Sequence, residues 1–308
     1  GATLTGIFKD VLVWITVLGT LAVVYVSAGG LVHALQVAGF VKATNVSATL
    51  RKELHGLPIP YGYLPSTPLL ISAYFSLALG SAFALYLYPH AINGSLSSDS
   101  SRNLKISTAL MPIYGIGLAL IALFGILIYD YSSALALVEK AGNGALAVPA
   151  LIGAAMPDWF VGLAYAAIFI GGLVPASIMA IGVGNLVARN VVSELRPSSP
   201  QTELSVAKWV SLIIKFVALG FVFVVPPTYA IALQLLGGII IAQTFPAVFM
   251  ALFTDKLHPK STLAGLIVGL ITGIYLTLAA NNFGPITTTL YAVGPYKLYI
   301  ALIALGIN

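Results

Sequence analysis

The chain has no cysteine and very little charge. Only 7% of its 308 residues are Asp, Glu, Lys or Arg, whereas an ordinary soluble domain carries about 25%. The missing cysteines exclude disulfides and thiolate metal sites. Hydrophobic residues make up 59% and the mean hydropathy is +1.01, so too few polar side chains remain to cover a soluble globule. The composition predicts a protein that crosses a membrane several times.

Long apolar stretches predict the membrane-spanning helices, since about 20 residues cross the roughly 30 Å of hydrocarbon in a bilayer. Seven stretches qualify: Val11–Gly30, Pro68–His90, Ile106–Tyr129, Trp159–Ala188, Ser205–Val225, Tyr229–Phe253 and Thr262–Ala280. Pro226 and Pro227 separate the fifth from the sixth, because proline cannot continue a helix. An eighth begins near Lys297 and reaches Asn308 after 12 residues. We expect one all-α transmembrane domain over residues 1–308, with seven spans and a truncated eighth.

Basic residues predict the orientation in the membrane. With the first residues cytoplasmic, these lie on the cytoplasmic side: Lys9, Arg102, Lys105, Arg189, Arg196, Lys208, Lys256 and Lys260. The net charge of +5 then reflects this loop bias rather than nucleic-acid binding. We expect a multi-pass protein of the cell membrane, surrounded by the lipid bilayer.

Motifs of enzymes are absent. The four histidines lie at or beyond span ends, and the sequence has no HExxH, no GxSxG and no paired intramembrane aspartates. We therefore expect no enzyme, no catalytic residue and no organic cofactor.

Lys215 interrupts the apolar pattern of the fifth stretch. It lies roughly 15 Å along that helix, at about 1.5 Å per residue, and so near mid-membrane. A lysine there either extends its charge to the interface or has a functional or buried structural role.

Prolines and polar groups mark three other spans. The segment 83–90 carries aromatic residues before Pro89 and His90, which predicts either a kink with an interfacial aromatic belt or a helix broken to face a cavity. Small residues in 171–185 indicate close helix packing or carbonyls bared to a cation. Gln243 with Pro246 is a candidate wall of a binding site.

Several blocks together resemble one transporter family, and they lie in the same order along the chain. They are Tyr88–Ser100, Met111–Tyr114, Val174–Asn190, Val210–Lys215, Leu233–Gly238 and Gln243–Val248. They resemble the sodium:solute symporter family, and within it the branch of monocarboxylate uptake permeases. The resemblance implies a partial LeuT-type fold of inverted repeats, with the last helix of the first repeat and the complete second repeat. The first core helices are then missing, and this piece is not expected to transport alone.

The resemblance also implies where ions bind. The cation positions of the family fall on Ser177, Ala180 and Ile181, so a sodium ion is expected near Ser177 as the coupling ion. Ala180 and Ile181 are apolar here, whereas hard cations prefer oxygen ligands. Asp10 matches an acidic residue associated with ion passage, and its alternative is an ordinary first-turn carboxylate beside Lys9.

The function expected from this resemblance is secondary active transport of a small organic anion, a monocarboxylate, by alternating access. Coupling is to sodium or protons, and one hypothesis is that Lys215 replaces the lost hydroxyl ligands. The substrate contacts are predicted to be Tyr86, Tyr88, His90, Gln243 and Asn185. The alternative is a membrane sensor or scaffold that keeps the same fold without transporting.

Overall fold

The computed structural model describes residues 2–37, 67–196, 199–226 and 229–308. In these ranges six helices are long and apolar enough to span a membrane, and a bent helix pair forms a seventh candidate. The six spans contain α1 (Ala2–Ser27), α4 (Pro68–Leu87), α6 (Ser101–Leu127), α9 (Asp158–Val187), α11 (Pro200–Val224) and α14 (Pro259–Ala280). The bent pair is α12 (Ala230–Ala242) with α13 (Phe245–Ala251). All seven stretches predicted from hydropathy thus correspond to helices.

Local sequence sets where these helices begin. Thr67 caps α4, because its Oγ1 accepts a hydrogen bond from the Leu70 amide at 3.2 Å, and Ser100 caps α6 in the same way. Pro68 and Pro259 occupy the first turns of α4 and α14, where a missing N–H costs nothing. Between α11 and α12, Pro227 lies outside the described residues.

The chain divides into two compact units, which are described separately. Unit 1 comprises residues 1–64 and 98–216. It contains α1, α6, α9 and the first part of α11, together with short helices that hydropathy did not predict: α7 (Ser132–Ala141), α8 (Ala147–Ala155) and α10 (Ser193–Leu195). Two short turns, η1 (Ile128–Asp130) and η2 (Gly144–Leu146), flank α7, and a π-helical turn, η3 (Ala188–Val192), extends α9.

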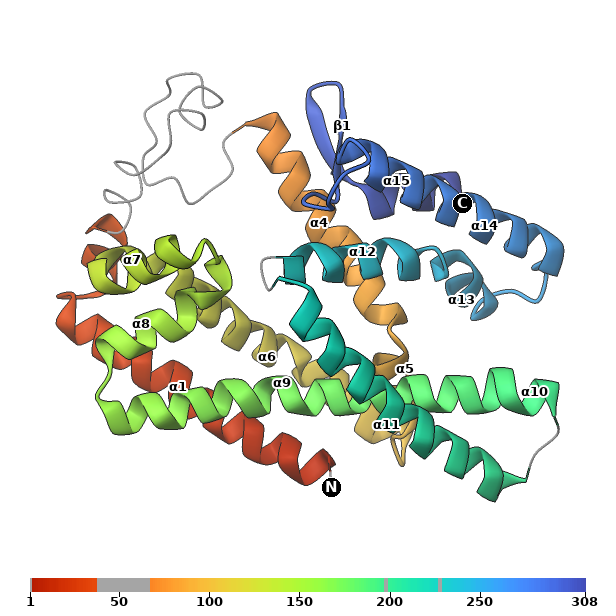
Figure 1. Ribbon diagram of the computed structural model, residues 1–308, viewed down its shortest axis with the longest axis horizontal. Coiled ribbons are helices and arrows are strands. Elements are labelled where there is room, and N and C mark those ends of the chain that lie inside the picture. The colour runs from red at the N-terminus through yellow and green to blue at the C-terminus, as the bar shows by residue number, and fades with distance from the viewer. Residues whose placement is uncertain (1, 38–66, 197–198, 227–228) are drawn as a thin grey trace. The chain divides into compact units, whose positions relative to one another are not determined.

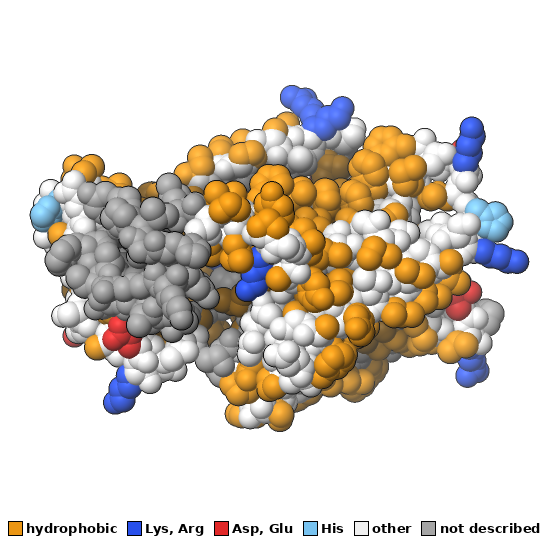
Figure 2. All heavy atoms as spheres, turned by 90° about the horizontal axis from the view of Figure 1, so that it is seen from above, with side chains coloured by type: hydrophobic (Ala, Val, Ile, Leu, Met, Phe, Trp, Pro, Cys, Tyr) orange, Lys and Arg blue, Asp and Glu red, His pale blue; other side chains and the backbone are white. Residues whose placement is uncertain are grey.

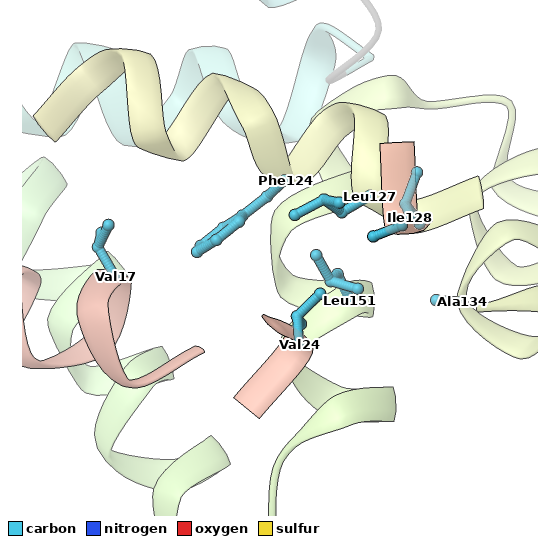
Figure 3. Packing of buried hydrophobic residues seen from close by; sticks show 8 residues of the cluster. Val17, Val24, Phe124, Leu127, Ile128, Ala134 and Leu151 are labelled. Atoms are coloured by element: carbon cyan, nitrogen blue, oxygen red, sulfur yellow. The ribbon is translucent and has the colours of Figure 1, made fainter. Parts of the chain in front are cut away.

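Figure 3 shows the main core of unit 1, where side chains of α1, α6, α7 and α8 are among those that meet. Phe124 and Leu127 of α6 pack with Val24 of α1 and Leu151 of α8, and each of these four is at most 1% exposed. Helix α1 also packs along α9. Because lipid is as apolar as these side chains, close packing rather than removal from water stabilises their contacts, and these contacts join α8 to one end of the spanning helices.

Helices α9 and α11 cross closely within unit 1 (Figure 1). A Cβ at Gly184 of α9 would collide with the Ser211 hydroxyl and lie 2.5 Å from the Ala207 carbonyl oxygen. The Ser211 hydroxyl is shared between two carbonyls, that of Ala207 at 2.7 Å and that of Ala180 on α9 at 2.9 Å. The absence of a side chain at Gly184 therefore permits this contact, and Ser211 fixes it.

Unit 2 comprises residues 65–97 and 217–308. It contains α4, α5 (Pro89–Leu96), α12, α13, α14 and α15 (Ile300–Ile307). It also contains an antiparallel hairpin of β1 (Leu290–Val293) and β2 (Tyr296–Tyr299), in which Leu290 pairs with Tyr299. The hairpin adds a β element to the predicted all-α fold, and α15 begins at Ile300 rather than near Lys297.

Two serines of α4 explain why residues 296–299 are extended. The Ser72 and Ser76 hydroxyls accept hydrogen bonds from the backbone amides of Lys297 and Tyr299, at 3.0 and 2.9 Å. The Tyr299 ring, 0% exposed, lies against Gly80, where a Cβ would collide with it. The Tyr299 hydroxyl donates a hydrogen bond to the Leu235 carbonyl at 2.6 Å.

The described surface is strongly apolar. Figure 2 shows hydrophobic side chains over much of the face in view, with Lys and Arg side chains as scattered single positions. In the most apolar 18-residue stretch of α11, only 6% of the residues are buried inside the protein. In the corresponding stretches of the other five long helices, the share is 17–22%. Because such helices expose more apolar surface than water tolerates, this is the surface of an integral membrane protein.

Candidate functional site

Two of the apolar helices of unit 2 are interrupted. Helix α4 ends at Leu87, Tyr88 is extended with φ −60° and ψ 132°, and α5 begins at Pro89. Because proline has no N–H, the Leu85 carbonyl loses its helical donor there. Helices α12 and α13 are bent by 48° at a break that contains Gln243 and Thr244. The structure thus has an interruption at Tyr88, and the two interpretations of residues 83–90, a kink or a helix broken to face a cavity, stay predictions.

A stack of aromatic rings connects the two breaks. The Phe83 ring of α4 lies 4.6 Å from the Phe245 ring of α13, nearly parallel at 25°. Phe245 stacks in turn on Phe249 at 5.0 Å, and Phe249 lies 5.0 Å from Phe253. The predicted site residues did not include Phe83 or Phe245; the available signal was the position of Phe245 directly before Pro246 and of Phe83 within the aromatic segment that precedes Pro89.

Three predicted substrate residues lie at the first break. The rings of Tyr88 and His90 are half-buried and stack at 5.3 Å, whereas Tyr86 is 49% exposed. The break thus brings Tyr88 and His90 together, while Tyr86 points away from the packed interior of unit 2. Their contact with a substrate stays a prediction.

Gln243 lies at the second break and is 1% exposed. Its Nε2 donates to the Ile239 carbonyl at 3.0 Å and to the Ala301 carbonyl of α15 at 3.4 Å. Asn308 Nδ2 donates to the Gln243 backbone carbonyl at 2.7 Å and to its Oε1 at 3.3 Å. Both ends of the amide therefore have protein partners at the bend, and a contact of Gln243 with a substrate stays a prediction.

The predicted cation residues lie on α9, which is continuous through Pro175. Ala180 is 4% exposed, and its carbonyl accepts the Ser211 hydroxyl at 2.9 Å. Ile181 is 46% exposed and Ser177 is half-buried. The side chains of the set therefore offer one oxygen, the Ser177 hydroxyl, which is a poor side-chain ligand set for a hard cation. The described residues hold no group of three or more His, Asp and Glu side chains that fits a metal ion.

Asn185 and Lys215 line one open cavity in unit 1, of about 500 Å³, between α9 and α11. The rest of its lining is Ile181, Leu204, Ala207, Lys208, Ser211 and Leu212. Asn185 and Lys215 are both exposed. Sequence reasoning did not select Lys208, although its spacing of seven residues from Lys215 places both on one helical face.

Asp10 forms an ion pair with Lys9, whose Nζ lies 2.8 Å from Asp10 Oδ1. The same Nζ lies 5.4 Å from the center of the Tyr114 ring on α6. Asp10 also lines a small cavity of about 10 Å³ with Trp14 and Tyr114. The alternative of a first-turn carboxylate is wrong in one respect: Asp10 pairs with Lys9, but α1 begins at Ala2 and Asp10 lies beyond its first turn. A role for Asp10 in ion passage stays a prediction.

The described residues form six long apolar helices and a bent pair, and their outer surfaces are apolar. These features define a multi-pass integral membrane protein. Its particular family is shown by sequence. The chain belongs to the sodium:solute symporter family, whose family profile matches residues 2–269. This is a family of transporters rather than enzymes, which confirms the resemblance found in the sequence.

Curated relatives agree with the family. The chain is 38% identical to the "Monocarboxylate transport permease protein" of Rhizobium johnstonii, over 77% of this chain and 47% of the relative. It is 32% identical to the "Uncharacterized symporter YodF" of Bacillus subtilis, over 92% of this chain and 53% of the relative. The chain thus spans about half the length of the curated relatives it matches. No solved structure matches it, so the LeuT-type arrangement stays a prediction.

Proposed function

We propose that the protein containing this chain is a secondary transporter that moves a small organic acid across the cell membrane by alternating access. Monocarboxylates are the proposed substrate class, because a relative named for their transport is 38% identical. The observation that carries the proposal is the pair of broken helices in unit 2, joined by the stacked rings of Phe83 and Phe245. Broken helices are where secondary transporters hold substrates near mid-membrane.

The chemistry at the first break supports an anionic substrate. Helix α5 starts at Pro89 directly after the extended Tyr88, and the N-terminus of a helix is the positive end of its dipole, which attracts anions. Pro89 has no N–H and the Ala91 and Ile92 amides already donate to the Tyr88 carbonyl, so the polar groups proposed for an anion are the side chains of Tyr88 and His90. In this proposal Tyr86, Tyr88 and His90 contact the substrate, and Gln243 maintains the bend opposite them.

The proposed coupling does not require sodium. Two of the three cation positions, Ala180 and Ile181, lack side-chain oxygens, and the Ala180 carbonyl is already bonded to Ser211. Lys215 lines the same cavity as Ile181. In this proposal its ammonium supplies the positive charge that a sodium ion supplies elsewhere in the family.

Uptake by the full-length protein in liposomes tests both parts. Radiolabelled pyruvate, lactate and propionate are offered with sodium or with choline outside, and empty liposomes are the control. We expect uptake that is retained in choline and is reduced by a protonophore. Uptake that falls to the level of empty liposomes in choline overturns sodium-independent coupling. No uptake of any of the three acids with either cation overturns the transport function.

A further inference from the structure

The cavity between α9 and α11 has an unusual distribution of charge. Its eight lining residues include Lys208 and Lys215 but no carboxylate. Both lysines are exposed, and the one ion pair within 4 Å that the described part of the chain contains is that of Lys9 with Asp10. The cavity therefore holds two positive charges without a counter-charge from the protein.

The geometry of α11 places both lysines on the helical face that lines this cavity. Lys208, Ser211, Leu212 and Lys215 follow the i, i+3, i+4, i+7 spacing of one helical face, and the Ser211 contact fixes that face against α9. Lys208 and Lys215 are about 10 Å apart along the axis, at roughly 1.5 Å per residue. Side chains on a helix lean toward its N-terminus, so the Lys215 stem leans in the direction of Lys208.

The other residues of the cavity supply a hydrogen-bonding side chain and an apolar surface. Asn185 on α9 supplies an amide that both donates and accepts hydrogen bonds. Ile181, Leu204, Ala207 and Leu212 supply apolar surface. Ser211 is not a free donor, because its hydroxyl is used by the carbonyls of Ala180 and Ala207. The one carboxylate on α11, that of Glu203, accepts the Ser193 hydroxyl at 2.9 Å and does not line the cavity.

We infer that this cavity binds an amphiphilic anion, whose carboxylate or phosphate lies between Lys208 and Lys215 and whose apolar part lies on the leucine and isoleucine wall. Two like charges on one helical face repel each other, and an oxyanion between them removes that repulsion and forms charge-assisted hydrogen bonds. A volume of about 500 Å³ lies within the usual range for small-ligand pockets, about 300–1,000 Å³. The site concerns binding and does not depend on transport.

Binding is tested on the full-length protein, purified in an uncharged detergent, by its melting temperature at increasing probe concentration. The probes are dihexanoyl-phosphatidylglycerol and pyruvate, and dihexanoyl-phosphatidylcholine is the control with a neutral head group. We expect one of the anionic probes to raise the melting temperature and the neutral lipid not to raise it. If only phosphatidylglycerol raises the melting temperature, the ligand of the cavity is a lipid head group. If only pyruvate raises it, the ligand is a small carboxylate.

Substitutions of the two lysines test whether the rise in melting temperature depends on their charges. Lys208→Met and Lys215→Met are each expected to weaken the apparent affinity about tenfold, the loss of one charge-assisted hydrogen bond. Lys208→Arg and Lys215→Arg keep the charge and are expected to retain binding. Lys256→Met, which removes an exposed lysine outside unit 1, is the matched control. The inference is overturned if neither anionic probe shifts the melting temperature, or if the double methionine variant responds as strongly as the wild type.

Discussion

Gln243 offers the sharpest test, because two different roles predict different measurements. Its amide donates to the Ile239 carbonyl at 3.0 Å and to the Ala301 carbonyl at 3.4 Å, and it accepts from Asn308 at 3.3 Å. The first bond is well formed and the other two are long. The first bond contributes about 1 kcal/mol to the free energy of unfolding and each of the others less, so together they contribute about 2 kcal/mol. Gln243→Met keeps the side-chain volume but removes these bonds, and its free energy of unfolding is expected to fall by that amount.

Gln243→Ala also leaves a cavity in a site where the side chain is 1% exposed. The cavity adds to the loss of hydrogen bonds, so this variant is expected to lose about 3–4 kcal/mol in all. Thermal unfolding of the full-length protein in detergent measures both variants. Gln201→Ala, at an exposed position of α11, is the control and is expected to change little.

The opposite result refutes the structural role. If Gln243→Met and Gln243→Ala melt like the wild type while their KM for substrate rises, the amide contacts the substrate instead of holding the bend. A loss of stability with an unchanged KM in the folded fraction supports the role described here.

Two other contacts give predictions of stability. Gly184→Ala places a Cβ against the Ala207 carbonyl oxygen and the Ser211 hydroxyl, so it is expected to lower the free energy of unfolding by about 1–3 kcal/mol. In the control variant, Gly172→Ala on the same helix, the added Cβ meets no atom within 4 Å, and the free energy of unfolding is expected to rise by up to about 1 kcal/mol. Equal melting temperatures for the two variants would contradict the close crossing of α9 and α11. Tyr299→Phe removes the hydrogen bond to the Leu235 carbonyl and is expected to cost about 1 kcal/mol, with an unchanged melting temperature as the contrary result.

Sequence reasoning found the spanning helices because their signal is local. A helix satisfies its own backbone hydrogen bonds in lipid, so an apolar run with Thr67-Pro68 or Ser100 at its start is nearly sufficient to specify one. The hairpin at 290–299 was missed because its polar groups are satisfied by Ser72 and Ser76, more than 200 residues earlier. The helices α7 and α8 were missed because they are too short to produce a spanning signal.

The candidate site was predicted in part. Pro89 indicated a kink or a break near Tyr88, since proline removes a backbone donor wherever it occurs, whereas the bend at Gln243 was not predicted. The stacking of Phe83 on Phe245 joins residues far apart in the chain, and no local pattern specifies such a pair. The same holds for Gln243, whose amide donates to the Ala301 carbonyl of α15, 58 residues later; its contact with a substrate stays a prediction.

The sequence by itself determined that this chain lies in a membrane, which segments cross it, and to which family it belongs, because apolar runs and ordered motifs are properties of the chain alone. It also determined that Lys208 and Lys215 share a helical face, since helical periodicity is fixed. Only the tertiary structure decided that this face meets α9 at Gly184, beside Asn185. That contact depends on a close approach of two helices. As a result, Lys208 and Lys215 line one cavity together with residues of α9, and no carboxylate lines that cavity.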